Sequence, residues 1–320
     1  MLKKICLILM ISSTYFINAR SQQRDYAFKI IPLGVKGGDD ESNLSSYLLA
    51  PKGSNSFICL DAGTINAGIQ KAIDQKALKG VSEEIQRRQI KGYLISHAHL
   101  DHVAGLIINS PADTSKNIYG LSSVLNILRD KYFTWDAWAN FGNEGEKPQL
   151  KKYTYTTLEE EFSYPLAETE MRVRAFELSH GKPYKSTAFL IQAKDNYVLY
   201  LGDTGADEIE KSDKLSELWQ EVAPLINTGN LKAIFMEVSF PNEQPVNQLF
   251  GHLTPQLFFS ELAKLQNITT PEALKKVSFI VTHRKPPVKN MLTIKQQLRV
   301  LNAPGFKLIF PNQGKLLTIN

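Results

Sequence analysis

Three histidines and an aspartate fall within six consecutive positions of "SHAHLDH" (residues 96–102), directly after an apolar stretch. Side chains alternate along an extended segment, so His97 and His99 point to the same side and can hold one metal ion. Where the chain turns into the following helix, Asp101 and His102 can hold a second ion. Imidazole and carboxylate ligands suit zinc, manganese or iron, and a cluster without cysteine argues against a purely structural zinc site. A single or structural metal ion is the alternative interpretation.

The other three histidines also lie at the end of an expected strand or just before an expected helix. His180 closes "AFELSH", His283 closes "FIVTH", and His252 in "GHLT" leads into an expected helix. A lone histidine at a strand end is more often a structural residue. All six histidines of the chain lie at the end of a strand or the start of a helix, and this favours one shared site.

Two aspartates occupy similar positions at strand ends. Asp203 in "YLGDTG" ends an expected strand, and a carboxylate in that place can bridge two cations. Asp61 in "CLDAGT" has the same local setting. We predict that Asp61 accepts a hydrogen bond from a ligating histidine and so orients it.

The elements that must position these residues follow from hydrophobic patterning. Strands are expected at 26–34, 44–50, 56–63, 92–96, 171–178, 187–193, 197–203, 231–239 and 277–283, followed by two closing strands. Helices are expected at 65–78, from 102, at 206–220, from Thr254-Pro255 and at 290–302. The sequence contains two successive sets of elements, and in each set strands come before helices. This order predicts an α/β protein with a two-layer sheet core and helices on both outer faces. The polar clusters would then gather at strand ends.

Domain organisation follows from length and composition. The chain has 320 residues, of which 43% are hydrophobic and 22% charged, the balance of a globular protein. We predict one catalytic domain over residues 22–320. Within it, the stretch from about 130 to 170 reads as an irregular, lid-like insertion.

The first residues have the pattern of a secretory signal peptide, which we place at residues 1–21. Lys3 and Lys4 precede an apolar run that is too short to span a membrane. A buried N-terminal strand is the alternative. Cys6 lies before the apolar run rather than after it, which argues against lipid attachment and a stable membrane anchor. We therefore expect a periplasmic or secreted protein.

Net charge and cysteine content limit the kinds of partner and the disulfides that we expect for this chain. The formal charge is +5, and removing Lys3, Lys4 and Arg20 leaves 34 basic residues against 32 acidic ones, or +2. This near-neutral balance gives no reason to expect a nucleic-acid polymer as partner. Cys6 and Cys59 are the only cysteines, so a processed chain has no internal disulfide.

The pattern of these residues resembles the metallo-β-lactamase superfamily. The run from His97 to His102 fits its H-x-H-x-D-H motif, and His180, Asp203 and His283 follow in the expected order. The resemblance implies an αββα sandwich, the metallo-β-lactamase-like fold. It also implies two divalent metal ions, with zinc as the expected ion. One ion would bind His97, His99 and His180. The other would bind Asp101, His102 and His283, and Asp203 would bridge the two.

A narrower resemblance is to the class II 3′,5′-cyclic-nucleotide phosphodiesterases. It is carried by "HAHLDHVAGLIINSP" and by "GGDDESNLSSYLL" (37–49), "TWDAWANFGNEG" (134–145), "KSTAFLI" (185–191), "EVSFPNE" (237–243), "FGHLTP" (250–255) and "VTHRK" (281–285). The family usually has proline where this chain has Asp39 and Ala139. The resemblance implies a metal-dependent hydrolase that opens cyclic AMP or cyclic GMP to the nucleoside 5′-monophosphate with metal-activated water. A small cyclic nucleotide would be the partner, and a homodimer is an open expectation.

His252 remains once the implied metal ligands are assigned, and we predict that it protonates the leaving 3′ oxygen while Glu237 holds its other ring nitrogen. The segments Glu237-Val238-Ser239 and His252-Leu253-Thr254 are similar to the E-x-T and H-x-T motifs of tRNase Z. On this basis Ser239 and Thr254 are expected substrate contacts, and Asp101 is expected to take part in catalysis. The alternative is that His252 caps a loop or contacts metal.

The aromatic residues of the 130–170 stretch are candidates for binding the base. Trp135 and Trp138, with Phe141 nearby, can stack on a purine, and Asn140 can hydrogen-bond its edge. The alternative is that these aromatics only fix the stretch to the core.

Other functions on the same ligand set stay open. A lactonase, a β-lactamase or an RNA-processing nuclease would use the same fold, although export and low charge disfavour tRNA. An iron-dependent oxidoreductase is a further alternative, but flavin-partnered diiron relatives usually replace the second histidine by glutamate, and His99 is present. A non-catalytic binding protein is disfavoured by the complete ligand set.

Overall fold

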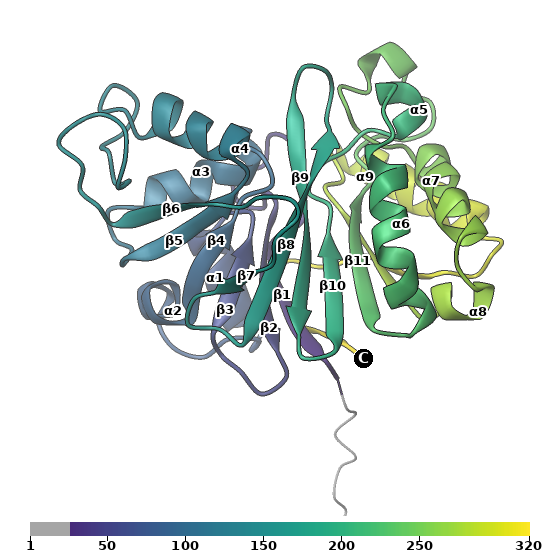
Figure 1. Ribbon diagram of the computed structural model, residues 1–320, viewed down its shortest axis with the longest axis horizontal. Coiled ribbons are helices and arrows are strands. Elements are labelled where there is room, and N and C mark those ends of the chain that lie inside the picture. Colours follow the sequence, from purple (N-terminus) through teal and green to yellow (C-terminus); the bar gives the residue numbers. More distant parts are fainter. Residues whose placement is uncertain (1–25) are drawn as a thin grey trace, which may run out of the picture.

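Two seven-stranded sheets pack face to face, and helices cover the outer side of each (Figure 1). The computed structural model describes residues 26–320. The predicted signal peptide, residues 1–21, lies outside the described residues. None of the helices between residues 26 and 320 has the length and apolar character that a membrane crossing requires.

The first sheet has the strand order β14-β1-β2-β3-β4-β5-β6. Its strands are β1 (Phe28–Gly34), β2 (Ser46–Pro51), β3 (Phe57–Leu60), β4 (Ile90–Leu94), β5 (Lys116–Gly120), β6 (Tyr153–Thr157) and β14 (Leu317–Ile319). Strands β3 to β6 are parallel. Parallel neighbours need crossover connections, and these hold α1 (Asn66–Asp74), α2 (Ser82–Gln89), α3 (Leu100–Asn109), α4 (Ser122–Ile127) and the π-helix η1 (Leu128–Tyr132).

The second sheet has the order β13-β12-β11-β10-β9-β8-β7. Its strands are β7 (Tyr164–Leu166), β8 (Met171–Ser179), β9 (Lys185–Ala193), β10 (Asn196–Tyr200), β11 (Leu231–Glu237), β12 (Ser278–Thr282) and β13 (Lys307–Ile309). Strands β10 to β13 are parallel, whereas β7, β8 and β9 form antiparallel pairs. The chain between them forms α5 (Asp207–Glu210), α6 (Lys214–Asn227), η2 (Val246–Gln248), α7 (Pro255–Asn267), α8 (Pro271–Leu274) and α9 (Val288–Leu301).

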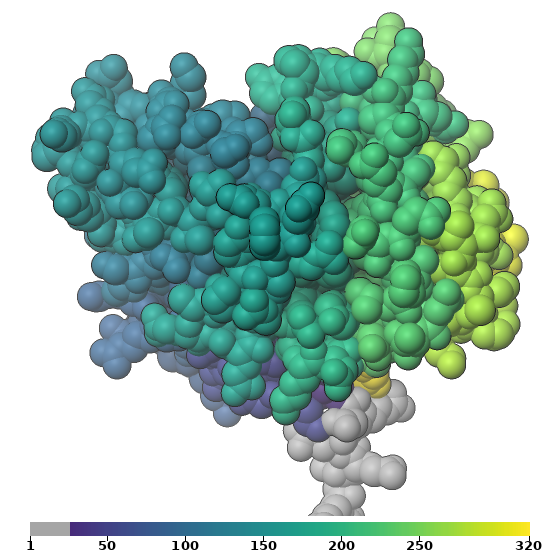
Figure 2. All heavy atoms as spheres, in the orientation of Figure 1, coloured from purple at the N-terminus to yellow at the C-terminus, as the bar shows by residue number. Residues whose placement is uncertain are grey.

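Three hydrophobic cores hold the layers together. One lies between the sheets and includes Tyr47, Phe189 and Phe235. The other two lie between each sheet and its helices. Helix α6 shows why: it buries Leu215, Leu218, Trp219 and Val222, the i, i+3, i+4, i+7 stripe of an amphipathic helix. The predicted αββα arrangement is confirmed, and Figure 2 shows the blue and teal first half packed directly against the green second half.

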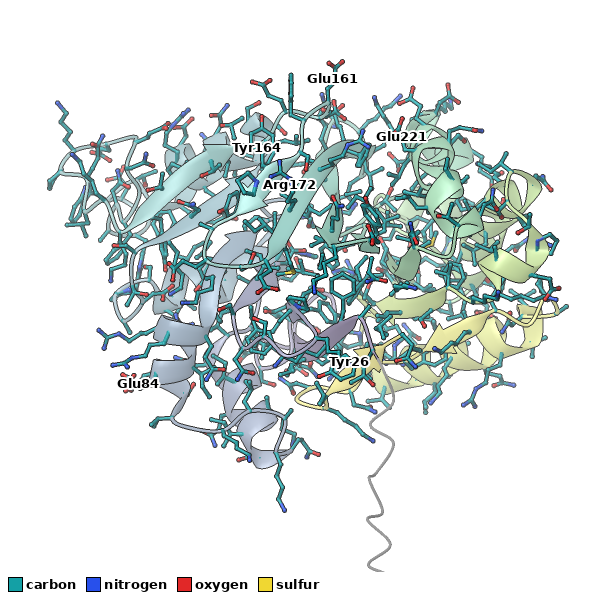
Figure 3. The ribbon with its side chains drawn as sticks, turned by 60° about the horizontal axis from the view of Figure 1, so that its bottom comes forward. Tyr26, Glu84, Glu161, Tyr164, Arg172 and Glu221 are labelled. Carbon is teal, nitrogen blue, oxygen red and sulfur yellow. The ribbon has the colours of Figure 1, made fainter. Side chains whose placement is uncertain are left out.

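The sequence-based elements agree with the main strands and longer helices of the structure, but the short helices α2, α4 and α8 were not predicted, and three further places differ. The helix expected at 206–220 is divided into α5 and α6. Strand β5 had not been predicted. The stretch expected to be irregular, 130–170, contains β6 and β7, and β6 pairs with β5 in the first sheet. The sequence of β6 is "YTYTT", which has no apolar run although both residue types favour strands, and its Tyr153 is buried in the core. Figure 3 shows Tyr164 on β7 and Arg172 on β8, the outermost strand pair of the second sheet.

The topology brings the chemically active residues to one edge of the sandwich. Strands β8, β10, β11 and β12 run in the same direction, and so do β3 and β4 of the facing sheet. His180 follows β8, Asp203 follows β10 and His283 follows β12. The carboxyl ends of parallel strands form the usual ligand-binding edge of an α/β sheet.

Candidate metal centre

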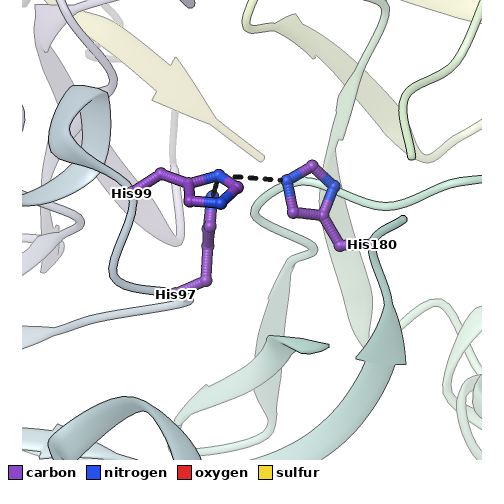
Figure 4. A group of neighbouring side chains, drawn as sticks. All are labelled: His97, His99 and His180. Atoms are coloured by element: carbon purple, nitrogen blue, oxygen red, sulfur yellow. Dashed lines mark hydrogen bonds between the residues drawn. The ribbon is translucent and has the colours of Figure 1, made fainter. Parts of the chain in front are cut away.

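A first group of possible metal ligands consists of His97, His99 and His180, whose donor atoms all lie within 4.8 Å of one another. His97 and His99 come from the loop between β4 and α3, and His180 comes from the other sheet (Figure 4). Nε2 of His97 lies 3.1 Å from Nδ1 of His99, and Nε2 of His180 lies 3.4 Å from the same atom. The structure therefore brings together the three residues predicted for one ion.

A second group consists of Asp101, His102 and His283, also with donor atoms within 4.8 Å of one another. Asp101 and His102 lie in the first turn of α3, and His283 directly follows β12. Nε2 of His283 lies 3.0 Å from Oδ2 of Asp101. These are the three residues predicted for the other ion.

Asp203 faces both groups. Its Oδ2 lies 3.2 Å from Nε2 of His102 and 3.1 Å from Nε2 of His283 in the second group. The same oxygen lies 3.8 Å from Nε2 of His97 and 3.9 Å from Nε2 of His180 in the first. A carboxylate between two ligand groups has the geometry of a bridge.

The residues fit a metal centre because two of their buried atoms lack partners. Within residues 26–320, Nε2 of His102 and Oδ1 of Asp203 are buried and make no hydrogen bond. Leaving such atoms unpaired costs about 1–3 kcal/mol each, and cation coordination would remove that cost. The donor set of imidazoles and carboxylates suits zinc and other divalent ions.

Asp61 has the orienting position that the sequence predicted for it. Its Oδ2 lies 2.7 Å from Nδ1 of His102, so a proton on Nδ1 leaves Nε2 free to bind an ion. The same oxygen accepts hydrogen bonds from the hydroxyls of Ser96 (2.8 Å) and Tyr200 (2.6 Å). The Asp61 carboxylate thus joins the two sheets beneath the ligand groups.

His252 and Glu237 form a buried pair beside the ligand groups. Nδ1 of His252 lies 2.7 Å from Oε1 of Glu237, as predicted for a histidine held through its other ring nitrogen. His252 also belongs to two further groups that could hold a metal ion, one with His180 and Asp203 and one with Glu237 and His283. Metal contact by His252 therefore stays an alternative to acid catalysis.

Burial and mutual charge set the protonation of the site. Burial lowers the pKa of His97, His180 and His252, which keeps these rings neutral and ready to bind a cation. Burial raises the pKa of Glu237 to about 7, and the charge of Asp203 adds to this. Burial also opposes the charge of Asp203, but the charges of His283 and His102 outweigh it and hold its pKa well below the usual range.

A glycine segment closes over the second ligand group. A Cβ atom at Gly37 would lie 2.1 Å from Cε1 of His283, so only glycine fits there. The backbone N–H of Gly38 donates to Oδ2 of Asp101 at 2.9 Å. The Gly37-Gly38 pair therefore lies against two candidate ligands, His283 and Asp101.

Three predicted substrate contacts are engaged within the protein in this structure. Asn140 is fully buried, and its side chain donates to the carbonyls of Glu144 and Glu146 and accepts from Gly142 N–H, which fixes a turn and leaves nothing for a base edge. Thr254 is the N-cap of α7. Ser239 is fully buried.

The hydroxyl of Ser239 contacts two residues of the candidate site. Its hydroxyl donates to Oε2 of Glu237 at 2.5 Å and lies 2.8 Å from Nδ1 of His283. A proton on Nδ1 of His283 can bond to this hydroxyl, which turns Nε2 toward Asp101 and Asp203. Ser239 therefore orients a candidate ligand, a role that only spatial proximity reveals.

The two tryptophans predicted to bind the base are held by hydrogen bonds outside the cavity beside the first ligand group. The indole N–H of Trp135 donates to the carbonyl of Pro148, and that of Trp138 donates to the hydroxyl of Ser110, both at 3.0 Å. Neither tryptophan lines the cavity of about 440 Å³ beside His97 and His99. The aromatic residues that do line it are Tyr132 and Tyr184. These hydrogen bonds favour the alternative, in which the tryptophans fix their segment to its surroundings.

Sequence and structure comparisons agree with this arrangement. Residues 26–314 match the family model described as class II cAMP phosphodiesterases. The chain is 39% identical to a 3′,5′-cyclic-nucleotide phosphodiesterase of Aliivibrio fischeri, over 98% of each chain. A crystal structure of unliganded yeast PDE1 superimposes with a TM-score of 0.80 at 23% identity, covering 92% of this chain and all of that one. The metallo-beta-lactamase fold protein YhfI of Bacillus subtilis gives 0.58 at 15% identity, covering 91% and 99%. The predicted metallo-β-lactamase-like fold is confirmed.

Proposed function

The chain belongs to the class II cAMP phosphodiesterase family, and on that premise we propose that it hydrolyses 3′,5′-cyclic nucleotides to nucleoside 5′-monophosphates. The observation that carries the proposal is the pair of convergent ligand groups joined by Asp203. Cyclic AMP and cyclic GMP are both proposed substrates.

The proposed cofactors are two divalent ions, with zinc as the preferred ion. His97, His99 and His180 would hold one and Asp101, His102 and His283 the other, with Asp203 between them. When bound, such ions supply an activated water at neutral pH and neutralise charge on the phosphoryl oxygens. Asp61 and Ser239 support the proposal because each holds one nitrogen of a ligand histidine and directs the other into the centre.

The proposed acid is His252. Hydrolysis adds water across the P–O3′ bond: the hydroxyl joins phosphorus, the bond to O3′ breaks, and O3′ takes a proton. Nδ1 of His252 is held by Glu237, so Nε2 is the atom that would deliver this proton. The raised pKa of Glu237, caused first by its burial, favours a proton shared between the two side chains. Asp101 contributes by fixing His283.

The test is a product assay on the purified protein. Cyclic AMP and cyclic GMP are incubated with and without a chelator, and the 5′- and 3′-monophosphates are separated by chromatography. We expect chelator-sensitive formation of the 5′-monophosphate alone. The absence of turnover with both nucleotides contradicts the proposal. A lactone, a β-lactam and a precursor tRNA in the same assay test the other hydrolase activities, and a colourless protein in which metal analysis finds no iron excludes the iron-dependent oxidoreductase.

Export and self-association complete the proposal. The basic start and short apolar run of residues 1–21 support a cleaved signal and a periplasmic or secreted location. Cell fractionation with N-terminal sequencing of the processed chain tests this, and an unprocessed chain in the cytosol contradicts it. The expected homodimer is tested by light scattering of the purified protein.

A further inference from the structure

The cavity beside the first ligand group has the size and lining of a small-molecule site. Its volume of about 440 Å³ lies within the usual range of roughly 300–1,000 Å³ for ligand pockets. His97 and His99 form one part of its wall, and Val124, Ile127, Tyr132 and Tyr184 supply apolar and aromatic surface. A ligand held here would therefore lie directly against the candidate metal centre.

Tyr184 is fixed to the metal centre through its backbone while its ring stays accessible. Its N–H donates to the carbonyl of Gly181 at 3.0 Å, and its carbonyl accepts from N–H of His180 at 3.3 Å. The ring centroid lies 5.2 Å from that of His99. Tyr184 is 56% exposed, so packing within the core does not explain its position. An exposed ring in contact with a candidate ligand histidine offers a flat surface on which a substrate can stack.

Tyr132 supplies a second ring, from a different segment of the chain. It is the last residue of the π-helix η1, a distortion that often accompanies functional sites. Its hydroxyl donates to the carbonyl of Ala98 at 2.9 Å, between the ligands His97 and His99. The ring is therefore held in place relative to the first ligand group.

We propose that Tyr132 and Tyr184 bind the purine base of the substrate in this cavity while the phosphate lies at the metal centre. The inference rests on the proposed function, and it assigns base binding to these residues rather than to Trp135 and Trp138. A purine is flat and largely apolar on its faces, and stacking on one aromatic side chain contributes about 1–3 kcal/mol per base. The bonds that hold Tyr184 involve only its backbone, so its ring can adjust to either purine.

The variant Tyr184→Ala provides the main test, because the exposed side chain leaves the fold unaffected. Stacking of that strength predicts a rise in KM of roughly 5- to 150-fold for cyclic AMP and cyclic GMP, with kcat and metal content retained. Tyr184→Phe should restore most of the affinity. Phe162→Ala is the matched control, an exposed aromatic (54%) outside the cavity, and should leave KM unchanged.

A substrate without a base separates stacking from effects on the metal centre. Methyl riboside 3′,5′-cyclic phosphate has the same cyclic phosphate, and Tyr184→Ala should hydrolyse it as well as the wild type does. Equal impairment with this compound, or an unchanged KM for both nucleotides, overturns the proposal. Binding of AMP and GMP by calorimetry tests the cavity independently of turnover. Weaker binding in Tyr184→Ala supports the assignment even where hydrolysis fails, and equal binding refutes it.

Discussion

The carboxylate of Asp61 lies 2.7 Å from Nδ1 of His102, and neither side chain is exposed to solvent. Nε2 of the same ring faces Asp203 at 3.2 Å and has no hydrogen-bond partner within residues 26–320. Asp61 thus determines which nitrogen of His102 is free. Asp61 contacts the ring on the side that faces away from the ligand groups, and this contact leaves Nε2 directed toward a cation.

Asp61→Ala should weaken metal binding more than it weakens the fold. Loss of such an orienting partner typically costs about 10- to 100-fold in metal affinity or activity. Competition with a chromophoric chelator measures the affinity, and Asp61→Asn, which preserves the shape and one acceptor oxygen, should lose less. A variant that binds metal as tightly as the wild type would show that Asp61 has no orienting role.

His252→Ala should retain both ions and lose catalysis. General acid catalysis contributes about 10²- to 10⁴-fold, so a fall in kcat of that size is expected. Elemental analysis of the same sample supplies the control. If metal content falls together with kcat, His252 is a ligand, in line with the two additional groups that include it. Glu237→Gln should show a smaller loss of the same kind.

Removal of metal should lower the thermal stability of the protein. Ions that bind the folded chain stabilise it by about 2.7 kcal/mol at a hundredfold excess over Kd. Calorimetric scans with and without chelator should show a lower Tm for the apoprotein, restored by added zinc. Elemental analysis of the restored protein should give two ions for each chain. A single ion at saturation would contradict the dinuclear centre.

Cys59 should be unreactive while the protein is folded. The thiol is fully buried, and burial raises its pKa from 9.0 to about 12. Iodoacetamide at pH 8 should label it only after denaturation, as followed by mass spectrometry. Because the raised pKa favours the neutral thiol in the fold, its contribution to stability should be lost as pH rises from about 9 to 12. Rapid labelling of the native protein would contradict this account.

Asn140→Ala should destabilise the fold and leave substrate affinity unchanged. The substitution removes three hydrogen bonds to the backbone of Gly142, Glu144 and Glu146, and each contributes about 0.5–1.5 kcal/mol to stability. Urea unfolding measures the loss, and KM for cyclic AMP measures the second part of the prediction. A raised KM in a variant of normal stability would return Asn140 to the substrate site.

Local patterning was sufficient for most of the fold. Buried strands such as β2, β9 and β12 each contain a short apolar run, and α6 shows a clear amphipathic stripe, so their sequences indicate them directly. Strand β6 escaped prediction because threonine and tyrosine alternate in it without an apolar run. Its stability comes from pairing with β5 and from packing of Tyr153, and both depend on residues far away in sequence.

The candidate ligand set could be predicted from the sequence, because six histidines and two aspartates at strand ends and helix starts, together with the resemblance of their order to a known family, favour one shared site. Residue type does not tell whether a polar side chain faces the substrate or makes its hydrogen bonds within the protein. Tertiary structure shows that the Asn140 side chain is engaged by backbone groups, that the Ser239 hydroxyl donates to Glu237, and that Thr254 is the N-cap of α7. Tertiary structure also shows that Tyr132 and Tyr184, and not the tryptophans, line the cavity beside His97 and His99, because segments from both halves of the chain form that cavity.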